Sequence, residues 1–333
     1  MKSRFATFLK LTIIVFAGNA SASCSASGEG DEVDVELERR DGAERLGIEL
    51  SGSLQNPAFI LGGDAIVFTR FRDGYNRGVS DLFVYDIETG ELSTLLADGN
   101  GSVNLPGSVW NEESNTVVFS SDRGEHDEIY IVSDTGSAGE ETQITNRPNR
   151  QSYEPSFSSD GQWVVFESHD IDVEGNGVIT KYRVDGNSDY VDLTALDGDA
   201  RQPNWSPTGD RILYQQQDEG RWVIWSMDAD GDDKTKITNV GESSTDAVYS
   251  YDGQWVFYSS ENNDVELSNI YRVFTGGGES TRISSYAGYD GAPSVSPDGV
   301  TLVFESYAGD PDGSSGTTLW LMDMDDASAA HWR

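Results

Sequence analysis

A pattern of about twelve residues that recurs six times along the chain constrains the fold more than any other feature. The stretches PSFSSDGQWVVF (155–166) and PSVSPDGVTLVF (293–304) show it most clearly, and Glu-Ser follows each of them. The first apolar positions of successive copies lie 44 to 50 residues apart, which is a period typical of propeller blades. The six copies cover residues 57–68, 107–119, 155–166, 203–214, 247–258 and 293–304.

Each copy predicts four short strands. An apolar strand, a turn of the Ser-x-Asp-Gly type, a second apolar strand and a polar loop are followed by a third strand, another turn and a short fourth strand. Asp-Gly pairs such as Asp160-Gly161 supply the positive φ angles that tight hairpins need. Four antiparallel strands repeated around a ring form a β-propeller. The sequence therefore predicts an all-β fold, a six-bladed β-propeller of four-stranded antiparallel blades over residues 45–326.

The two ends of this region predict how the ring closes. The sixth copy supplies only three strands, whereas the segment RLGIELSG (45–52) precedes the first copy at the spacing kept by the other fourth strands. We expect this N-terminal strand to pair with the last blade, which leaves no open sheet edge there. Two copies depart from the pattern, because Gly62-Gly63 and Asn111-Glu112 replace the usual turn, and their turn geometry stays open.

The first 23 residues have the layout of a secretory signal peptide, with a basic start, an apolar run and then small residues. The apolar run is shorter than the roughly 20 residues that span a bilayer, so we expect no transmembrane helix. Cys24, the sole cysteine, is either the lipid acceptor of a bacterial lipoprotein or follows ordinary cleavage at the Ala20-Ser21-Ala22 pattern. Both alternatives predict an exported protein, periplasmic or anchored in the envelope, with residues 24–44 as an acidic flexible linker and 327–333 as a tail.

The charge of the chain excludes one class of partner. The formal net charge is −36, and such a surface repels nucleic acid and anionic lipid. We expect no nucleic-acid partner, membrane contact only through a lipid on Cys24, and a monomer. The carboxylates are spread along the chain, which favours a solubilising surface, as in a saline habitat, over a face made for a basic partner.

Motifs for catalysis are missing from the sequence, which favours binding over catalysis without deciding it. No Gly-x-Ser-x-Gly, His-Glu-x-x-His, Walker or dinucleotide motif occurs. His126 and His169 fall in loops of adjacent blades and could approach each other, but an exposed loop histidine is the simpler interpretation. The third histidine, His331, lies in the tail.

One loop has the pattern of a calcium-binding site, and calcium is the one cofactor that the sequence suggests. In HDIDVEGNG, Asp170, Asp172 and Glu174 alternate ahead of Gly175 like the oxygen ligands of a calcium loop. The bidentate Glu expected at the twelfth position is Lys181. A solvated acidic turn is therefore the favoured interpretation, and no other cofactor is expected.

The mouth of the central channel is the candidate binding site. The first strand of each propeller blade lines the channel, and the segments that enter these strands open onto one face. Their carboxylates could simply accept backbone hydrogen bonds at the blade corners. Alternatively, they could hold a polar ligand or a peptide, with Arg201 pairing with an anion. The candidate residues are Tyr153, Glu154, Arg201, Gln202, Thr245, Asp246, Tyr289 and Asp290.

The repeated motif also resembles a known family. Pro-x-aromatic-Ser-x-Asp-Gly, an apolar strand and then Ile-Tyr-x-Val/Met-Asp is similar to the PD40 (WD40-like) repeats of TolB-like periplasmic propellers, from residue 45 to about 325. This resemblance implies a binding scaffold for an envelope protein or peptide. The alternatives are a carbohydrate-binding or sugar-lyase-type propeller with a metal held by channel histidines, or a purely structural module. TolB also has an α/β domain ahead of its propeller, whereas only the linker is predicted here.

Overall fold

The computed structural model describes residues 41–105, 109–133, 141–171, 173, 175–196, 198–239, 241–261, 268–286, 288–307 and 316–324. All of them belong to one compact unit, Glu36–Arg333. The predicted signal peptide, Cys24, most of the predicted linker and the predicted tail lie outside the described residues. Within those residues, none of the helices has the length and apolar character needed to cross a bilayer.

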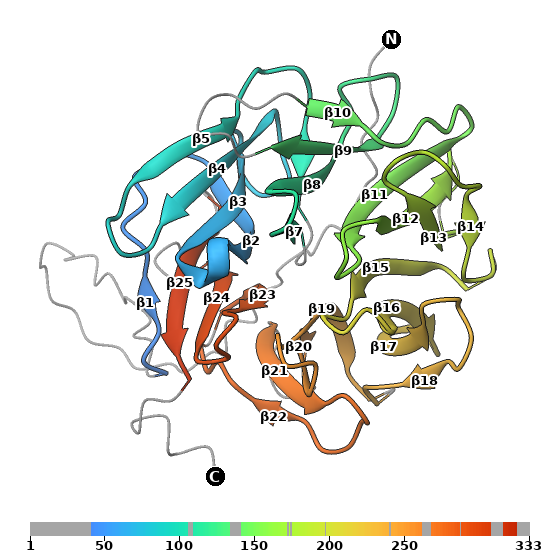
Figure 1. The fold of residues 1–333 in the computed structure, drawn as a ribbon. Coiled ribbons are helices and arrows are strands. Elements are labelled where there is room, and N and C mark those ends of the chain that lie inside the picture. The colour runs from blue at the N-terminus through green and yellow to red at the C-terminus, as the bar shows by residue number, and fades with distance from the viewer. Residues whose placement is uncertain are drawn as a thin grey trace, which may run out of the picture. The chain divides into compact units, whose positions relative to one another are not determined.

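Six antiparallel sheets follow one another in chain order around a common centre, with β2, β6/β7, β11, β15, β19 and β23 innermost (Figure 1). This arrangement confirms the predicted six-bladed propeller. Blade 1 comprises β2 (Ser53–Ile60), β3 (Ala65–Phe71), β4 (Ser80–Asp86) and β5 (Leu92–Leu96), with the 3-10 turn η1 (Leu61–Gly63) between β2 and β3. Blade 2 comprises β6 (Val103–Asn104), β7 (Trp110–Asn111), β8 (Thr116–Ser121), β9 (Glu128–Ser133) and β10 (Glu141–Gln143).

The remaining four blades repeat the same order from the centre outwards. Blade 3 comprises β11 (Arg150–Phe157), β12 (Trp163–Asp170), β13 (Val178–Arg183) and β14 (Val191–Asp192). Blade 4 comprises β15 (Ala200–Trp205), β16 (Arg211–Asp218), β17 (Arg221–Asp228) and β18 (Thr235–Lys236). Blade 5 comprises β19 (Ser243–Tyr249), β20 (Trp255–Glu261), β21 (Asn269–Phe274) and β22 (Thr281–Arg282). Blade 6 comprises β23 (Asp290–Val295), β24 (Thr301–Ser306), β25 (Thr318–Asp323) and β1 (Glu44–Arg45).

The N-terminal strand closes the ring as predicted. β1 pairs antiparallel with β25, with Glu44 opposite Leu321, and the amide of Leu46 donates to the carbonyl of Leu319 at 2.9 Å. Regular pairing covers only Glu44–Arg45, whereas the sequence predicted a strand over 45–52. Beyond the paired residues, Ile48 continues into the hydrophobic cluster between blades 1 and 6. The outer edge of the last blade is therefore covered by a segment from the other end of the propeller.

The Ser-x-Asp-Gly turn has a local physical basis. In blade 3, Ser158 Oγ donates to Asp160 Oδ1 at 2.6 Å and accepts the amide of Trp163 at 3.0 Å. Gly161 takes the left-handed conformation, with φ at 65°, and its amide donates to the carbonyl of Ser158. The same bonds recur around Ser250 in blade 5 and Ser296 in blade 6. The motif therefore recurs because it builds the same hairpin.

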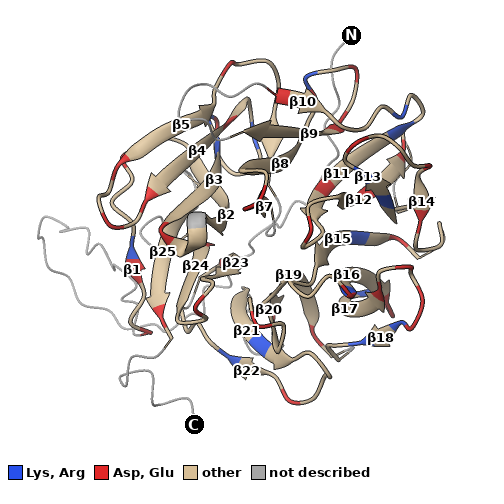
Figure 2. Ribbon diagram, in the orientation of Figure 1, with Lys and Arg blue, Asp and Glu red and all other residues tan. Residues whose placement is uncertain are grey.

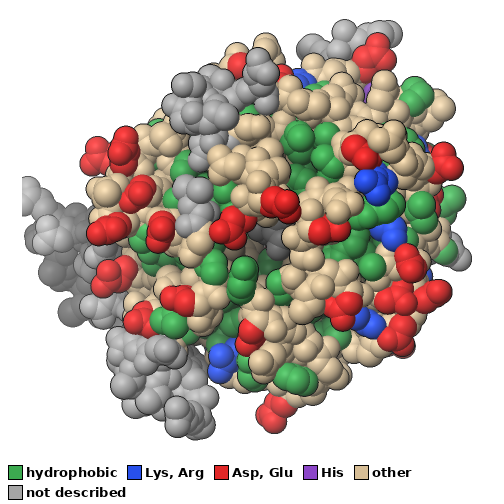
Figure 3. All heavy atoms as spheres, in the orientation of Figure 1, with side chains coloured by type: hydrophobic (Ala, Val, Ile, Leu, Met, Phe, Trp, Pro, Cys, Tyr) green, Lys and Arg blue, Asp and Glu red, His purple; other side chains and the backbone are tan. Residues whose placement is uncertain are grey.

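The aromatic residue that ends each copy packs between blades. Phe68, Phe119, Phe166 and Phe304 are completely buried. Second strands apolar on both faces suit this position, because each one is covered by sheets on both sides. Acidic residues occur in all six blades in Figure 2, and in Figure 3 acidic side chains are scattered over the visible face. The core is thus formed between sheets, while most of the acid stays outside it.

Candidate functional site: the central channel

A β-bulge interrupts the innermost strand at an equivalent point in five blades. The register with the second strand shifts at Gln55/Ala58, Tyr153/Ser156, Arg201/Asn204, Thr245/Val248 and Gly291/Ser294. One residue within each bulge is left-handed, with φ between 47° and 53°. Bulges turn side chains away from the regular alternation of a strand and hold them there. The left-handed bulge residues are Asn56, Glu154, Gln202, Asp246 and Ala292.

A side chain from the preceding blade caps the amide of several bulge residues. The donor Asn56 N lies 2.9 Å from Glu305 Oε2, and Gln202 N lies 3.0 Å from Glu167 Oε2. In another blade Ser259 Oγ accepts the amide of Ala292. Each capping residue directly follows the buried aromatic residue of a second strand. This explains the Glu of the repeated Phe-Glu-Ser, a signal that the sequence contained but that the prediction did not use.

Polar side chains at the channel form two hydrogen-bonded groups. In one, Asn104 Nδ2 donates to Glu154 at 3.2 Å and Asn104 Oδ1 accepts from Asn56 at 2.7 Å. In the other, Gln202 Nε2 donates to Asp246 Oδ1 at 2.9 Å, and Gln202 Oε1 accepts the amide of Asp246 at 3.2 Å. We call Asn56, Asn104, Glu154, Gln202 and Asp246 the channel ring. Its members come from five blades, so the closed fold is what brings them together.

Three tyrosines gather between blades 6 and 1 beside this ring. Tyr75, from the loop between β3 and β4, donates to Glu305 Oε1 at 3.0 Å, and Tyr289 donates to the same oxygen at 2.9 Å. The rings of Tyr75 and Tyr289 lie 6.1 Å apart edge to face, and Tyr307 lies 5.3 to 5.6 Å from both. We call Tyr75, Tyr289 and Tyr307 the tyrosine corner. Sequence reasoning missed Tyr75, because nothing in the pattern marks a loop residue that crosses to another blade.

Burial raises the pKa of two carboxyl groups at the channel, those of Glu305 and Glu154. Burial raises the pKa of Glu305 to about 7, although the hydrogen bonds from Asn56, Tyr289 and Tyr75 act in the opposite direction. The pKa of Glu154 is raised well above its usual range by burial and then by the charges of Glu167, Asp246 and Glu305. Four carboxyl groups from three blades therefore interact electrostatically around the channel.

Several predicted site residues lie at this channel, and others do not. Glu154, Gln202 and Asp246 belong to the channel ring, and the hydroxyl of Thr245 donates to Asp246 at 2.9 Å. Asp290 is completely buried, so it does not line the mouth. The repeat was misaligned by two residues in the last blade: Gly291, not Tyr289, pairs like Tyr153, and Ala292, not Asp290, is the bulge residue.

Arg201 already has an acidic partner. Its Nε and Nη2 each lie 3.0 Å from a carboxylate oxygen of Asp199, and the guanidinium stacks 5.2 Å from the ring centre of Trp222. A bidentate pair of this kind fixes the orientation of both side chains. Arg201 is therefore held at the wall near the channel mouth, with its charge balanced by Asp199.

Tyr153 and His169 contact each other in blade 3, whereas His126 lies apart from them in blade 2. The ring of Tyr153 meets that of His169 at 5.9 Å, and Nε2 of His169 lies 2.5 Å from Glu167. His126 instead lies 3.2 Å from its own partner, Glu128. Burial raises the pKa of the nearby Asp127 to about 7, with the charge of Asp122 adding to the effect. Each histidine therefore has its own carboxylate partner.

The predicted calcium loop is only partly described. Asp170 lies 3.5 Å from Arg150 Nε and accepts from Asn176 at 2.9 Å, whereas Asp172 and Glu174 lie outside the described residues. In the part of the chain that the structure describes, no group of three or more His, Cys, Asp or Glu residues could hold a metal ion. The calcium site remains a prediction.

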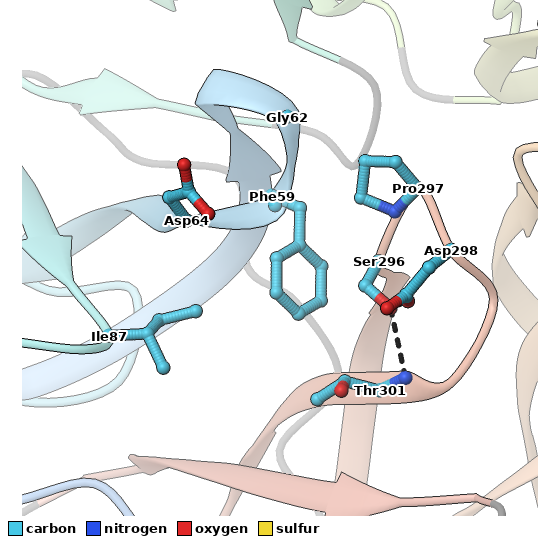
Figure 4. Close-up of a pocket in the computed structure, with 9 residues that line it drawn as sticks. Phe59, Gly62, Asp64, Ile87, Ser296, Pro297, Asp298 and Thr301 are labelled. Atoms are coloured by element: carbon cyan, nitrogen blue, oxygen red, sulfur yellow. Dashed lines mark hydrogen bonds between the residues drawn. The ribbon is translucent and has the colours of Figure 1, made fainter.

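A small groove lies at the other end of the same blades. Phe59 projects between Asp64 and Ile87 on one side and Pro297 on the other (Figure 4). The wall from blade 6 is the Ser-x-Asp-Gly turn, in which Ser296 Oγ accepts the amide of Thr301 at 2.9 Å. These residues belong to the recurring turn and to the contact between blades 6 and 1. The groove therefore follows from the packing of two neighbouring blades, and we assign no ligand to it.

Comparison with known proteins places the chain in a family. The model of PD40, described as the TolB beta propeller domain, matches residues 25–265 and 190–328. The chain belongs to this TolB propeller family. Among curated proteins, an uncharacterized protein of Agrobacterium fabrum (strain C58) is 34% identical to this TolB-family chain over 125 residues. That alignment spans 36% of the chain and 42% of the relative, which is less than half of the relative's length.

Solved structures with this fold include TolB proteins and an oligogalacturonate lyase. TolB from Acinetobacter baumannii superposes with a TM-score of 0.57 at 18% identity, over 74% of this chain and 60% of that protein. A putative TolB from Agrobacterium tumefaciens gives 0.59 at 16% identity, over 82% and 91%. An oligogalacturonate lyase from Vibrio parahaemolyticus gives 0.56 at 13% identity, over 86% and 94%. At these identities the likeness shows a common fold alone.

Proposed function

We propose that this TolB-family propeller is an exported binding scaffold that takes a protein or peptide segment of the cell envelope at its channel mouth and catalyses no reaction. The observation that carries the proposal is the channel ring beside the tyrosine corner. Export is supported by the signal-like pattern of residues 1–23, and membership of the family supports the binding role. A monomer is the expected state.

The ring and the corner have the properties of a preorganised peptide site. Four of the five ring side chains are attached to left-handed bulge residues, and the amides of Asn56, Gln202 and Asp246 bond to side chains of neighbouring blades. Little conformational entropy is therefore lost when these side chains bind a ligand. Tyrosines supply large contact area together with hydroxyl groups, and they are enriched where proteins bind one another. A segment entering the channel would meet polar groups of fixed orientation and an aromatic wall.

Selection from a displayed peptide library tests this function. We expect enriched peptides to bind the purified protein and to lose about tenfold or more in affinity when Tyr75→Ala removes part of the tyrosine corner. Tyr251→Ala, which removes an exposed tyrosine in the β19–β20 turn, is the matched control and should leave the affinity unchanged. Enrichment that is insensitive to Tyr75→Ala, or no enrichment at all, would contradict a peptide site at the mouth.

Carbohydrate binding or sugar lyase activity is the second candidate. The shared shape with oligogalacturonate lyases, one of them solved in complex with manganese, favours it, as does the group of Tyr153, His169 and Asp127. Thermal shift and native mass spectrometry with manganese, calcium and a panel of acidic and neutral oligosaccharides test it. Binding that is lost on His169→Gln would favour this candidate, whereas silence across the panel would favour the peptide partner.

Lipidation of Cys24 is a separate proposal. If the predicted lipoprotein signal is used, the mature protein carries lipid on Cys24 and is recovered with membranes. Intact-mass measurement of the exported protein distinguishes a lipid-modified Cys24 from an unmodified chain cleaved within the Ala20-Ser21-Ala22 pattern. If the protein is lipidated, Cys24→Ala removes the residue that carries the lipid. The variant should then be recovered in the soluble envelope fraction.

A further inference from the structure

Four carboxyl groups surround the channel, and none of them is paired with Lys or Arg among the described residues. Glu154 and Asp246 belong to the channel ring, while Glu167 and Glu305 cap bulge amides beside it. Their mutual effects on pKa show that they interact, because burial and then the charges of the other three raise the pKa of Glu154. Among the described ion pairs, none joins any of the four to Lys or Arg, and only His169 contacts one of them, Glu167. Such an arrangement is unfavourable when all four groups are ionised, and it is relieved either by protonation, which the raised pKa values of Glu154 and Glu305 reflect, or by a positive charge that enters the channel.

An unpaired amide oxygen lies at the same level of the channel wall. Gln215 occupies in β16 the position that Glu167 and Glu305 occupy in their second strands, since it pairs with Arg201 as Glu167 pairs with Tyr153. Side chains at this position reach towards the bulge amide of the next blade. In blade 5, however, the side chain of Gln202 already accepts the amide of Asp246. Gln215 is only 6% exposed, and among the described residues its Oε1 has no hydrogen-bond partner.

An acceptor left without a partner in a buried position costs free energy that a donor group can recover. Glu154 also has spare capacity, because its carboxylate accepts only the bond from Asn104 among those described, while its side chain stays partly exposed. The channel therefore offers carboxylates and an amide oxygen, all of which accept hydrogen bonds. The group that satisfies them must donate several hydrogen bonds and carry positive charge.

The spacing of the acceptors suits an organic cation. The described residues contain no group of three or more His, Cys, Asp or Glu placed to hold one metal ion. The acceptors instead belong to two separate hydrogen-bonded groups, one with Glu154 and one with Asp246. A guanidinium has five N–H donors and an ammonium has three, so either can bond to acceptors from more than one wall.

We propose that the channel binds the guanidinium or ammonium group of an Arg or Lys side chain carried by the partner peptide. This inference rests on the proposed function and specifies the chemistry of its ligand. The tyrosine corner contacts the backbone or apolar neighbours of that residue, while Glu154, Asp246 and Gln215 accept its N–H groups.

Calorimetric titration with defined probes tests the proposal. We expect acetyl-Gly-Arg-Gly-amide or acetyl-Gly-Lys-Gly-amide to bind the purified protein and acetyl-Gly-Gln-Gly-amide not to bind. The double variant Glu154→Gln/Asp246→Asn should weaken the binding by about tenfold or more. Glu112→Gln/Glu113→Gln makes the same change of charge at two exposed residues of a turn and should leave the affinity unchanged. If the double variant is misfolded, the single variant Glu154→Gln replaces it in the test. Its side chain accepts one described hydrogen bond, from Asn104, so we expect this variant to fold and to bind the basic peptides more weakly.

Four outcomes would overturn the proposal. Equal affinity for the Arg and Gln peptides would show that binding does not require a positive charge. An equal loss of affinity in the channel and control double variants would show that only the net charge of the protein matters. Binding of free spermidine without binding of either basic peptide would assign the site to a small amine. Library peptides that require Tyr75 but contain no Lys or Arg would leave the proposed function standing and contradict this inference alone, whereas the absence of any such peptides would contradict the function itself.

Discussion

Glu305 joins the last blade to the first through its hydrogen bonds. It accepts the hydroxyls of Tyr75 and Tyr289 and the amide of Asn56, and it is only 1% exposed. Three hydrogen bonds favour its ionised form, yet burial is the larger effect and raises its pKa to about 7. The carboxyl group is therefore neutral in the folded protein over a pH range in which it would be ionised in the unfolded chain.

This shift makes stability depend on pH with a definite sign. The pKa of Glu305 is about 7 in the folded protein against an ordinary value of 4.5, so the folded state holds this proton more tightly than the unfolded chain does. The stabilisation of the folded state by protonated Glu305 is therefore fully present below about pH 4.5 and is lost as the pH rises through 7. Glu305→Gln has the same shape and stays neutral, so it should raise the free energy of unfolding at pH 8 by up to about 3 kcal/mol and change it little at pH 4. Urea unfolding at both pH values measures this. The same gain from the exposed Glu112→Gln would contradict the assignment.

Gly291 makes room for the tyrosine corner. A Cβ at this position would lie 2.1 Å from the hydroxyl oxygen of Tyr289 and 2.4 Å from its Cζ, so the ring would have to move and lose its bonds. Gly291→Ala should therefore lower the free energy of unfolding by about 1 to 3 kcal/mol, as overpacking does. Thermal unfolding measures the loss. Gly47→Ala, where no atom lies within 4 Å, should change little, and an equal loss there would contradict the role of the tyrosine ring.

The residues of the site were only partly predictable. Glu154, Gln202 and Asp246 could be found because each directly precedes the Pro or Ala that opens a repeat copy, and the bulge follows the repeat. Asp290 was misplaced because the last copy was aligned on its Tyr-Asp pair, although Ala292 holds the equivalent position. Tyr75 could not be found, because its contacts to Glu305 and Tyr289 link residues more than 200 positions apart and depend on closure of the ring.

At the scale of the strand and turn, the recurring Ser of the hairpin should matter more than its neighbours. Ser158→Ala removes an oxygen that accepts the amide of Trp163 and donates to Asp160, so it should cost about 1 kcal/mol in the free energy of unfolding. Ser159→Ala changes an exposed residue of the same turn and is the matched control. Denaturant unfolding of both variants compares them. A loss for Ser159→Ala as large as that for Ser158→Ala would refute the hydrogen-bond explanation of the motif.

Elements were predictable where their determinants are local. The turns could be placed because Ser, Asp and Gly within five residues supply all of their bonds. In blade 2, Asn111 Oδ1 accepts the amide and hydroxyl of Ser114 instead, so a different side chain builds the turn whose geometry the sequence left open. The length of β1 could not be predicted, because it depends on contacts with distant residues. Only Glu44–Arg45 pair with β25, and the chain then turns into the core between blades 1 and 6.

At the scale of the whole molecule, stability depends on the contacts that close the ring. Thr317 Oγ1 donates to the carbonyl of Leu54 at 2.7 Å and lies 2.9 Å from Ser53 Oγ, with Ser53 and Thr317 both completely buried. Thr317→Val keeps the shape but leaves that carbonyl without this donor, so the free energy of unfolding should fall by about 1 to 3 kcal/mol. The exposed Thr235→Val is the control for the same change. Equal unfolding curves for the two variants would contradict a stabilising closure at Thr317.

The channel is the feature that exists only when all six blades are in place, and hydrogen–deuterium exchange with a library-selected peptide tests its role most directly. The account predicts that bound peptide slows exchange of backbone amides in the Tyr75 loop (72–79), at 151–154, at 199–202 and at 289–292, at one end of the channel. The turns at 61–64 and 297–300, at the other end of the blades, should exchange at an unchanged rate. Protection confined to those turns, or spread over the outer strands, would contradict a binding site at the channel mouth.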